Sequence, residues 1–238
     1  MYHRVVCKVT LQFPKSDRSL LKMANEIIET EADLQRGIRA LRRKCPIMRA
    51  VHDVTGLPPL RRREPGFEGL ARIIVGQQVS VASADAIWAR CETGIRPFTP
   101  QSITNMSDES LRAVGLSRPK VKTFRAIADA ANQGRLNFDT MHFNSEDEIY
   151  ASLTAISGIG PWTADIFLIM CLGRRDAFAA GDLALQIAAQ DASKLQERPT
   201  AEQLLELAET WRPWRAVAAR LLWSHYRLTK QKSSGAPL

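Results

Sequence analysis

The sequence predicts an all-α fold built from two lobes of short helices. Apolar residues recur at helical spacing along most of the chain, as in residues 67–74. Capping boxes, which mark the starts of helices, occur at residues 145–148 and 200–203. Glycines and prolines interrupt the periodic segments at short intervals. Together these observations indicate a bundle of short helices joined by tight turns.

The expected helices follow in order along the chain. Leu34, Ile38 and Leu41 predict a helix from Glu31 onward, because they share one helical face. Further helices are expected from Phe67, from Ser107 to Gly115, around Phe124 up to Gly134, from about Ser145 to Ala155, from Pro161 or Trp162, from Leu183, from Thr200, and from Pro213 through Trp223.

The same patterns predict the domain organisation. Residues 1–30 are expected to be a loosely ordered N-terminal extension, with a strand in residues 5–13 as the alternative. Residues 31–229 are expected to form the folded domain, with a central lobe over about 67–185. The N-terminal segment of this domain and its last helix would form the second lobe. Residues 230–238 lack an apolar pattern and are expected to be a disordered tail.

Charge points to a polyanionic partner. The 238 residues carry a formal net charge of +8, and the pI is about 9.6. Nucleic acid and an acidic membrane surface would both fit this charge. No long uncharged apolar run and no signal peptide is found. We therefore expect a cytoplasmic protein without a membrane partner, associated with the nucleoid if the host is bacterial.

Metal chemistry through side chains is not indicated. The cysteines Cys7, Cys45, Cys91 and Cys171 are scattered and contain no CxxC pair, so four free thiols are expected. The four histidines show no metal-binding spacing either. Any catalysis is therefore expected to use carboxylates or the backbone.

One motif predicts a phosphate contact. Residues 153–165 read LTAISGIGPWTAD, a helix end, a glycine-rich hairpin and a new helix. Glycine allows a sharp turn and a close approach, and Pro161 suits the first turn of a helix. The free N–H groups at the start of the second helix favour an anion, and on a basic protein this is a DNA phosphate. A plain helix–helix turn is the alternative.

A second motif follows the hairpin. Residues 178–185 read FAAGDLAL, which places Asp182 directly before a helical run. An aspartate in this setting is first of all an N-cap. The same position stabilises a negative charge through the helix dipole, so a cap can also present an ionised carboxylate to a reaction.

Together the two motifs resemble the helix-hairpin-helix DNA glycosylases, specifically the alkyladenine branch (3-methyladenine DNA glycosylase II). The resemblance extends from about Glu31 to Thr229 and includes PGFEGLARIIVGQQVS at 65–80, GLSRPKVKTF at 115–124 and WRPWRAVAARLLW at 211–223. It implies a DNA-binding cleft between the two helical lobes.

The resemblance also implies roles for individual residues. Asp182 takes the position of the catalytic aspartate, and Trp162 and Trp223 take positions that line the base pocket. The hairpin residues Ser157, Gly158, Ile159 and Gly160 would bind DNA, together with Gln77 and with Gln78, which falls at the wedge position that fills the gap left by the flipped base. The carbonyls of Thr154, Ile156 and Ile159 match those that hold a structural Na⁺ or K⁺ in relatives. Arg118, Lys120 and Lys122, on a turn after Gly115, are candidate phosphate contacts.

Departures from the family pattern concern the turns and the wedge. Ser157 replaces a proline in the hairpin, and Ala179 and Ala180 stand where a proline is often found. These changes are expected to loosen the turns without removing a reacting group. Gln78 is polar where some relatives have an apolar residue, which puts its intercalating role in doubt.

The family contains two reaction types, and the residues favour one of them. Trp162 occupies the position of the lysine that forms a Schiff base in bifunctional members, so we expect hydrolysis without lyase activity. No cysteine follows Cys171, so no iron–sulfur cluster is expected, and no cofactor is expected for catalysis. A purine alkylated at N3 or N7 is a cation that leaves as a neutral base. Tryptophan faces attract such a cation.

The expected protein is thus a monomeric enzyme that binds double-stranded DNA containing alkylated bases, flips the damaged nucleotide into the cleft and hydrolyses its glycosidic bond. Two alternatives remain. One is a non-catalytic helix-hairpin-helix DNA-binding protein, and the other is a glycosylase for another lesion.

Overall fold

The computed structural model describes residues 27–234 of the chain. Within this range the regular elements are helices, and the one β-type pairing is an isolated antiparallel bridge between Ile27 and Arg174. The helices are α2 (Glu31–Lys44), α3 (Pro46–Thr55), α4 (Phe67–Gly76), α5 (Val81–Gly94), α6 (Pro100–Asn105), α7 (Asp108–Ala113), α8 (Arg118–Asn132), η1 (Met141–Phe143), α9 (Glu146–Thr154), α10 (Pro161–Ile166), η2 (Phe167–Cys171), α11 (Leu183–Ser193), α12 (Ala201–Glu209) and α13 (Arg215–Ser234). The predicted all-α fold class is confirmed. No helix of this described part is long and apolar enough to cross a membrane.

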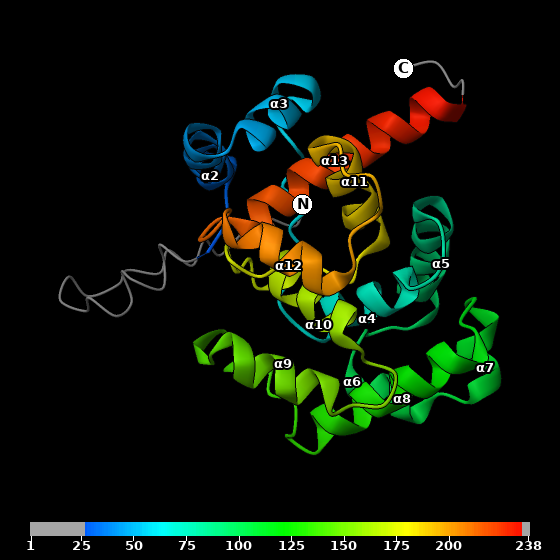
Figure 1. Cartoon of the computed structure of the whole chain (residues 1–238). Coiled ribbons are helices and arrows are strands. Elements are labelled where there is room, and N and C mark those ends of the chain that lie inside the picture. Colours follow the sequence, from blue (N-terminus) through cyan, green and yellow to red (C-terminus); the bar gives the residue numbers. More distant parts are fainter. Residues whose placement is uncertain (1–26, 235–238) are drawn as a thin grey trace, which may run out of the picture.

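The helices pack in two groups. The first and last helices of the described chain, α2, α3 and α13, pack against one another, and α13 also lies along α11. The middle helices form the other group, in which α4 contacts α5 and α8, while α6 and α7 contact α8 (Figure 1). Asp182 lies where the chain leaves the second group and enters α11.

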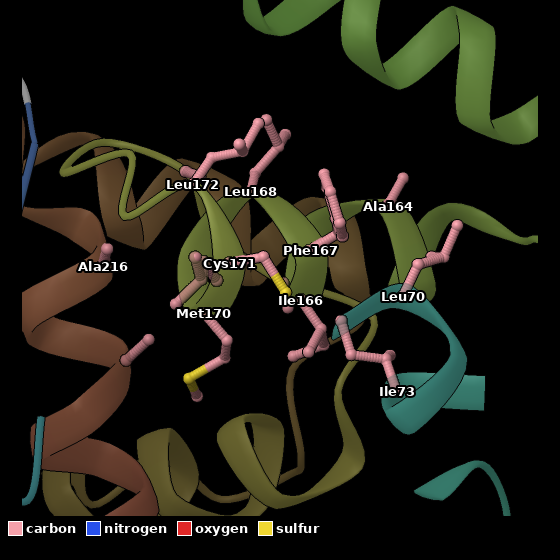
Figure 2. Close-up of a cluster of buried hydrophobic side chains, with 14 of the residues drawn as sticks. Leu70, Ile73, Ala164, Ile166, Phe167, Leu168, Met170, Cys171, Leu172 and Ala216 are labelled. Atoms are coloured by element: carbon pink, nitrogen blue, oxygen red, sulfur yellow. The ribbon is translucent and has the colours of Figure 1, made fainter. Parts of the chain in front are cut away.

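A helix buried on nearly all sides joins the two groups. The chain from Ala164 through η2 is almost entirely buried, and its side chains pack on α4 residues such as Leu70 and Ile73 (Figure 2). Two arginines satisfy carbonyls at its C-terminal end: Arg220 of α13 donates to Ile169 O at 3.0 Å, and Arg62 donates to Cys171 O. Burial lowers the pKa of Arg220 to about 10. The Arg220 hydrogen bond ties η2, which directly continues α10, to α13.

Two predicted helix starts are confirmed by their capping boxes. Ser145 and Thr200 form the predicted capping boxes, and Thr30 forms a further one at the start of α2. The expected start of the last helix was wrong, because Pro213 lies in the turn before Arg215 and its peptide bond with Arg212 is cis.

Both predicted terminal segments need correction where they are described. Ile28 is fully buried and its N–H donates to Gly173 O at 2.8 Å, while Thr30 caps α2, so residues 27–30 are held in place rather than loosely ordered. The predicted tail is wrong for residues 230–234, because α13 continues to Ser234. The alternative strand in residues 5–13 lies outside the described residues.

Candidate active site

The predicted hairpin connects α9 and α10. Gly158 has φ +88°, a conformation that favours glycine, and α10 begins at Pro161 as expected. A Cβ on Gly158 would lie 2.0 Å from the Oγ1 of Thr123 on α8, so the hairpin needs glycine here for space as well as for conformation. Ile159 is buried, which anchors the hairpin, while Ser157 and Gly160 are exposed.

A cavity of about 760 Å³ lies beside this hairpin. Four segments form its wall: the turn from Gly76 to Ser80 after α4, the hairpin with the start of α10, the segment 181–184 at the start of α11, and Tyr226 of α13. The cavity therefore opens between elements of both helix groups. Asp182 lies in its wall together with the N-terminus of α11.

Three N–H groups hold the Asp182 carboxylate. Its Oδ1 accepts from the Leu185 backbone N–H at 3.1 Å, which is the predicted N-cap, and from the Trp223 indole at 3.2 Å. Its Oδ2 accepts from the Trp162 indole at 2.7 Å. These three hydrogen bonds fix the orientation of the carboxylate. Because Oδ2 has one such donor, it can still accept a hydrogen bond from a water molecule in the cavity.

The two tryptophans therefore have a role that the sequence did not indicate. Both are half-buried, and both direct their indole N–H at Asp182. Trp162 lines the cavity, whereas Trp223 is absent from its wall. Trp223 contacts the site through its hydrogen bond to Asp182, and its predicted place in the base pocket stays a prediction.

The turn before Asp182 is not loose, despite the missing proline. Ala179 and Ala180 are buried, and the Asp182 N–H donates to Ala179 O at 2.9 Å. The amide of Gln186 also donates to Ala180 O at 3.0 Å. Hydrogen bonds and packing replace the proline as the constraint on this turn.

Gln77 and Gln78 differ in their contacts. The Gln77 amide donates to the Thr163 hydroxyl at 2.8 Å and reaches Gly158 O at 3.5 Å, so it ties the turn after α4 to the hairpin. Gln78 is exposed in the cavity wall, and its φ of +57° is uncommon for a residue other than glycine. Strained backbone often accompanies function. The turn thus presents the Gln78 side chain at the cavity mouth.

Of the three candidate phosphate contacts on α8, Lys120 is hydrogen-bonded within the protein, whereas Arg118 and Lys122 are exposed. The Lys120 ammonium donates to Val75 O at 2.6 Å, and burial lowers its pKa. In this structure the Lys120 ammonium therefore binds a carbonyl at the C-terminal end of α4, and its contact with a phosphate stays a prediction. Arg118 and Lys122 are exposed, outside the cavity wall.

The carbonyls expected to hold a monovalent cation are compatible with that role. Within the described chain, the carbonyls of Thr154 and Ile159 accept no hydrogen bond, whereas Ile156 O accepts from the Ile159 N–H at 3.0 Å. Unpaired carbonyl oxygens are suitable ligands for a hard cation. No group of His, Cys, Asp or Glu that could hold a metal ion is present among the described residues.

Sequence reasoning missed Tyr226. It lies three residues after Trp223 on α13, so the same helix face brings both toward the site. This three-residue spacing from Trp223 is the sequence signal that points to Tyr226.

Asp165, one turn after Trp162, is a partly buried carboxyl group. Burial raises its pKa to about 7, nearby Glu146 acts in the same direction, and Arg215 opposes the shift. Arg215 itself is held by Asp176 at 3.1 Å and by Glu209 at 3.3 Å. Asp165 accepts no hydrogen bond from another described residue, so its charge is poorly compensated in the folded protein.

We expect Asp165→Asn to raise the melting temperature by a few degrees at pH 8 and to have little effect near pH 4. The folded protein binds the Asp165 proton more tightly than the unfolded chain does. The wild type therefore loses stability as the pH rises from about 4, the unfolded value, to about 7, the folded one. Thermal melts across this range test the effect, with the exposed Asp129→Asn as the control. A parallel pH dependence in all three proteins would contradict it.

Comparison with known proteins gives a consistent result. Residues 71–213 match the model of the HhH-GPD superfamily of base excision DNA repair proteins. The chain is 33% identical over 174 residues to DNA-3-methyladenine glycosylase 1 of Schizosaccharomyces pombe, covering 71% of this chain and 75% of that protein. Its fold is similar to that of an S. pombe 3-methyladenine DNA glycosylase solved in complex with abasic DNA (TM-score 0.74, 28% identity, 82% of this chain and 97% of that one). It is also similar to that of a DNA-3-methyladenine glycosidase from Bacillus halodurans (TM-score 0.71, 28% identity, 82% and 91%). The chain belongs to the HhH-GPD superfamily of base excision DNA repair proteins.

Proposed function

We propose that this protein is a monofunctional DNA glycosylase that removes alkylated purines of the 3-methyladenine and 7-methylguanine type, acting as a monomer on double-stranded DNA. The observation that carries the proposal is the Asp182 carboxylate. It lies in a cavity next to the hairpin and accepts hydrogen bonds from a helix N-terminus and two indoles. A cap alone needs neither the cavity nor the indoles.

The reaction follows from where this carboxylate lies. The damaged nucleotide rotates out of the duplex into the cavity, because its glycosidic bond is inaccessible in the stack. As the bond between C1′ and the base nitrogen breaks, the base takes the electron pair and the sugar becomes cationic. The fixed negative charge of Asp182 stabilises this cation. Water adds to C1′ and loses a proton, for which Oδ2 is the acceptor with spare capacity.

The remaining site residues would bind and position the DNA. Backbone N–H groups at the hairpin and the start of α10 bind a phosphate, and Gln78 fills the space left by the flipped base. A monovalent cation held by the carbonyls of Thr154, Ile156 and Ile159 would add positive charge at this phosphate.

Hydrolysis without strand cleavage is the expected outcome with methylated duplex DNA. Trp162 offers no amine for a Schiff base, and its N–H is bound to Asp182. We expect release of 3-methyladenine and 7-methylguanine, intact strands until alkali is added, and no adduct after borohydride treatment. Chromatography of the released bases and denaturing gels measure both results.

Absence of base release would favour a DNA-binding protein without activity. A borohydride-trapped adduct would instead show lyase chemistry. Release of an oxidised base in preference to methylated ones would show that the substrate class is wrong.

A further inference from the structure

A second cavity adjoins the candidate active site, in the groove between α11 and α13. Its volume is about 750 Å³, and Tyr226 belongs to the walls of both cavities. The two helices run side by side in the structure (Figure 1). The groove therefore neighbours the active-site cavity, with Tyr226 in both walls, and nothing in the chemistry proposed above uses it.

The charged groups of this groove favour an anion. Lys194 and Lys230 lie in its wall, both are exposed, and neither forms an ion pair with a described carboxylate. The Lys230 ammonium lies 5.8 Å from the centre of the Tyr226 ring. The carboxylate in the wall, Asp191, accepts a hydrogen bond from His225 Nε2 at 2.6 Å, so it is directed at α13.

The rest of the lining is suited to a polar chain. Gln190 and Gln196 also line the groove, and the amide of Gln190 donates to Gln196 O at 3.3 Å. Lysines, amides and a hydroxyl-bearing ring contact phosphates and sugars in protein–DNA complexes. Ile187 and Leu195 are the aliphatic residues of the wall.

We propose that this groove binds the DNA backbone at a distance from the flipped nucleotide, with Lys194 and Lys230 contacting phosphates. The proposal rests on the proposed function, since it extends the DNA path from the active-site cavity past Tyr226. From Asp182 to Lys194, α11 rises by about 18 Å at 1.5 Å per residue. At about 3.4 Å per nucleotide, the contacted phosphates lie roughly five nucleotides from the damaged base.

The test compares Lys194→Gln/Lys230→Gln with the wild type on a long duplex carrying a stable abasic-site analogue at its centre. We expect several-fold weaker binding at about 0.15 M salt, and a log–log salt slope shallower by up to about 2, because each phosphate contact contributes about 0.9. The control is Arg39→Gln/Arg43→Gln, which removes two exposed cations from α2, in the part of the first helix group away from this groove. It should bind DNA as the wild type does.

Shortened duplexes supply the second part of the test. When the duplex ends about three base pairs from the abasic site on one side, the wild type should lose affinity and the lysine variant should not. Truncation on the other side should weaken both proteins equally. Unchanged affinity and slope of the variant on the long duplex, or an equal effect of the variant on all duplexes, would overturn the proposal.

Base release measured on the same proteins separates this proposal from the proposed function. The lysine variant should release bases at the wild-type rate when enzyme is saturating. If the wild type released no base but the lysine variant still bound DNA more weakly, the proposal for the groove would be supported and the proposed enzymatic function would be wrong. Normal base release by the wild type, together with unaltered DNA affinity of the lysine variant, would contradict only the proposal for the groove.

Discussion

Asp182→Asn should reduce the single-turnover rate of base release by about 10²–10³-fold, which is the typical effect of removing one preorganised stabilising group. The amide keeps the size of the carboxylate but supplies no full negative charge to the sugar cation. It can still cap α11 through Leu185, because asparagine and aspartate are comparable N-caps. Excision rates on methylated DNA at saturating enzyme measure the effect.

The contacts of Asp182 provide a sharper control for this variant. With the amide oxygen at the position of Oδ1, which has two N–H donors, the amide NH₂ faces the Trp162 indole N–H. Two donors then oppose each other, so the variant should lose about 1 kcal/mol of stability. Adding Trp162→Phe removes the opposing donor. Trp162→Phe has its own packing cost, so the double-mutant cycle is the measure: Asp182→Asn should cost less stability in the Trp162→Phe background than in the wild type, while base release stays low. Base release within a few-fold of the wild type in Asp182→Asn would mean that Asp182 is only a cap.

Gly158→Ala should lower the free energy of unfolding by about 2–5 kcal/mol. Adopting the left-handed region costs a residue other than glycine about 1–2 kcal/mol, and overpacking adds about 1–3 kcal/mol. The clash is with Thr123, whose Oγ1 would lie 2.0 Å from the new Cβ. We expect a melting temperature lower by about 5 °C or more, with weaker binding to undamaged duplex DNA because the hairpin is displaced.

The second glycine of the hairpin is the matched control. Gly160 has φ −98°, and a Cβ there would meet no atom within 4 Å. Gly160→Ala should therefore melt within about 2 °C of the wild type. Equal destabilisation by the two substitutions would show that the contact between Gly158 and Thr123 does not constrain the hairpin.

Much of the candidate site could be predicted because its signals are local. The glycine-rich hairpin, the start of α10 at Pro161 and the N-cap position of Asp182 depend on residues within a few positions of one another. Helix starts at Ser145 and Thr200 were predictable for the same reason. Where local signals were weak, the prediction failed: the polar residues 230–234 continue α13 because the buried part of that helix precedes them.

Sequence by itself thus determined the fold class, the hairpin and the N-cap position of Asp182, since caps, turns and helical periodicity are properties of short segments. The catalytic role expected for Asp182 came from the family resemblance. Only the tertiary structure decided what the side chains contact. The indoles of Trp162 and Trp223 reach Asp182 across 20 and 41 residues of chain, and Lys120 reaches Val75 O across 45. Tyr226 and the lysine-lined groove also arise only where α11 and α13 pack together. Such contacts depend on how helices are oriented against one another, and that orientation is set by the packing of the whole core rather than by any one segment.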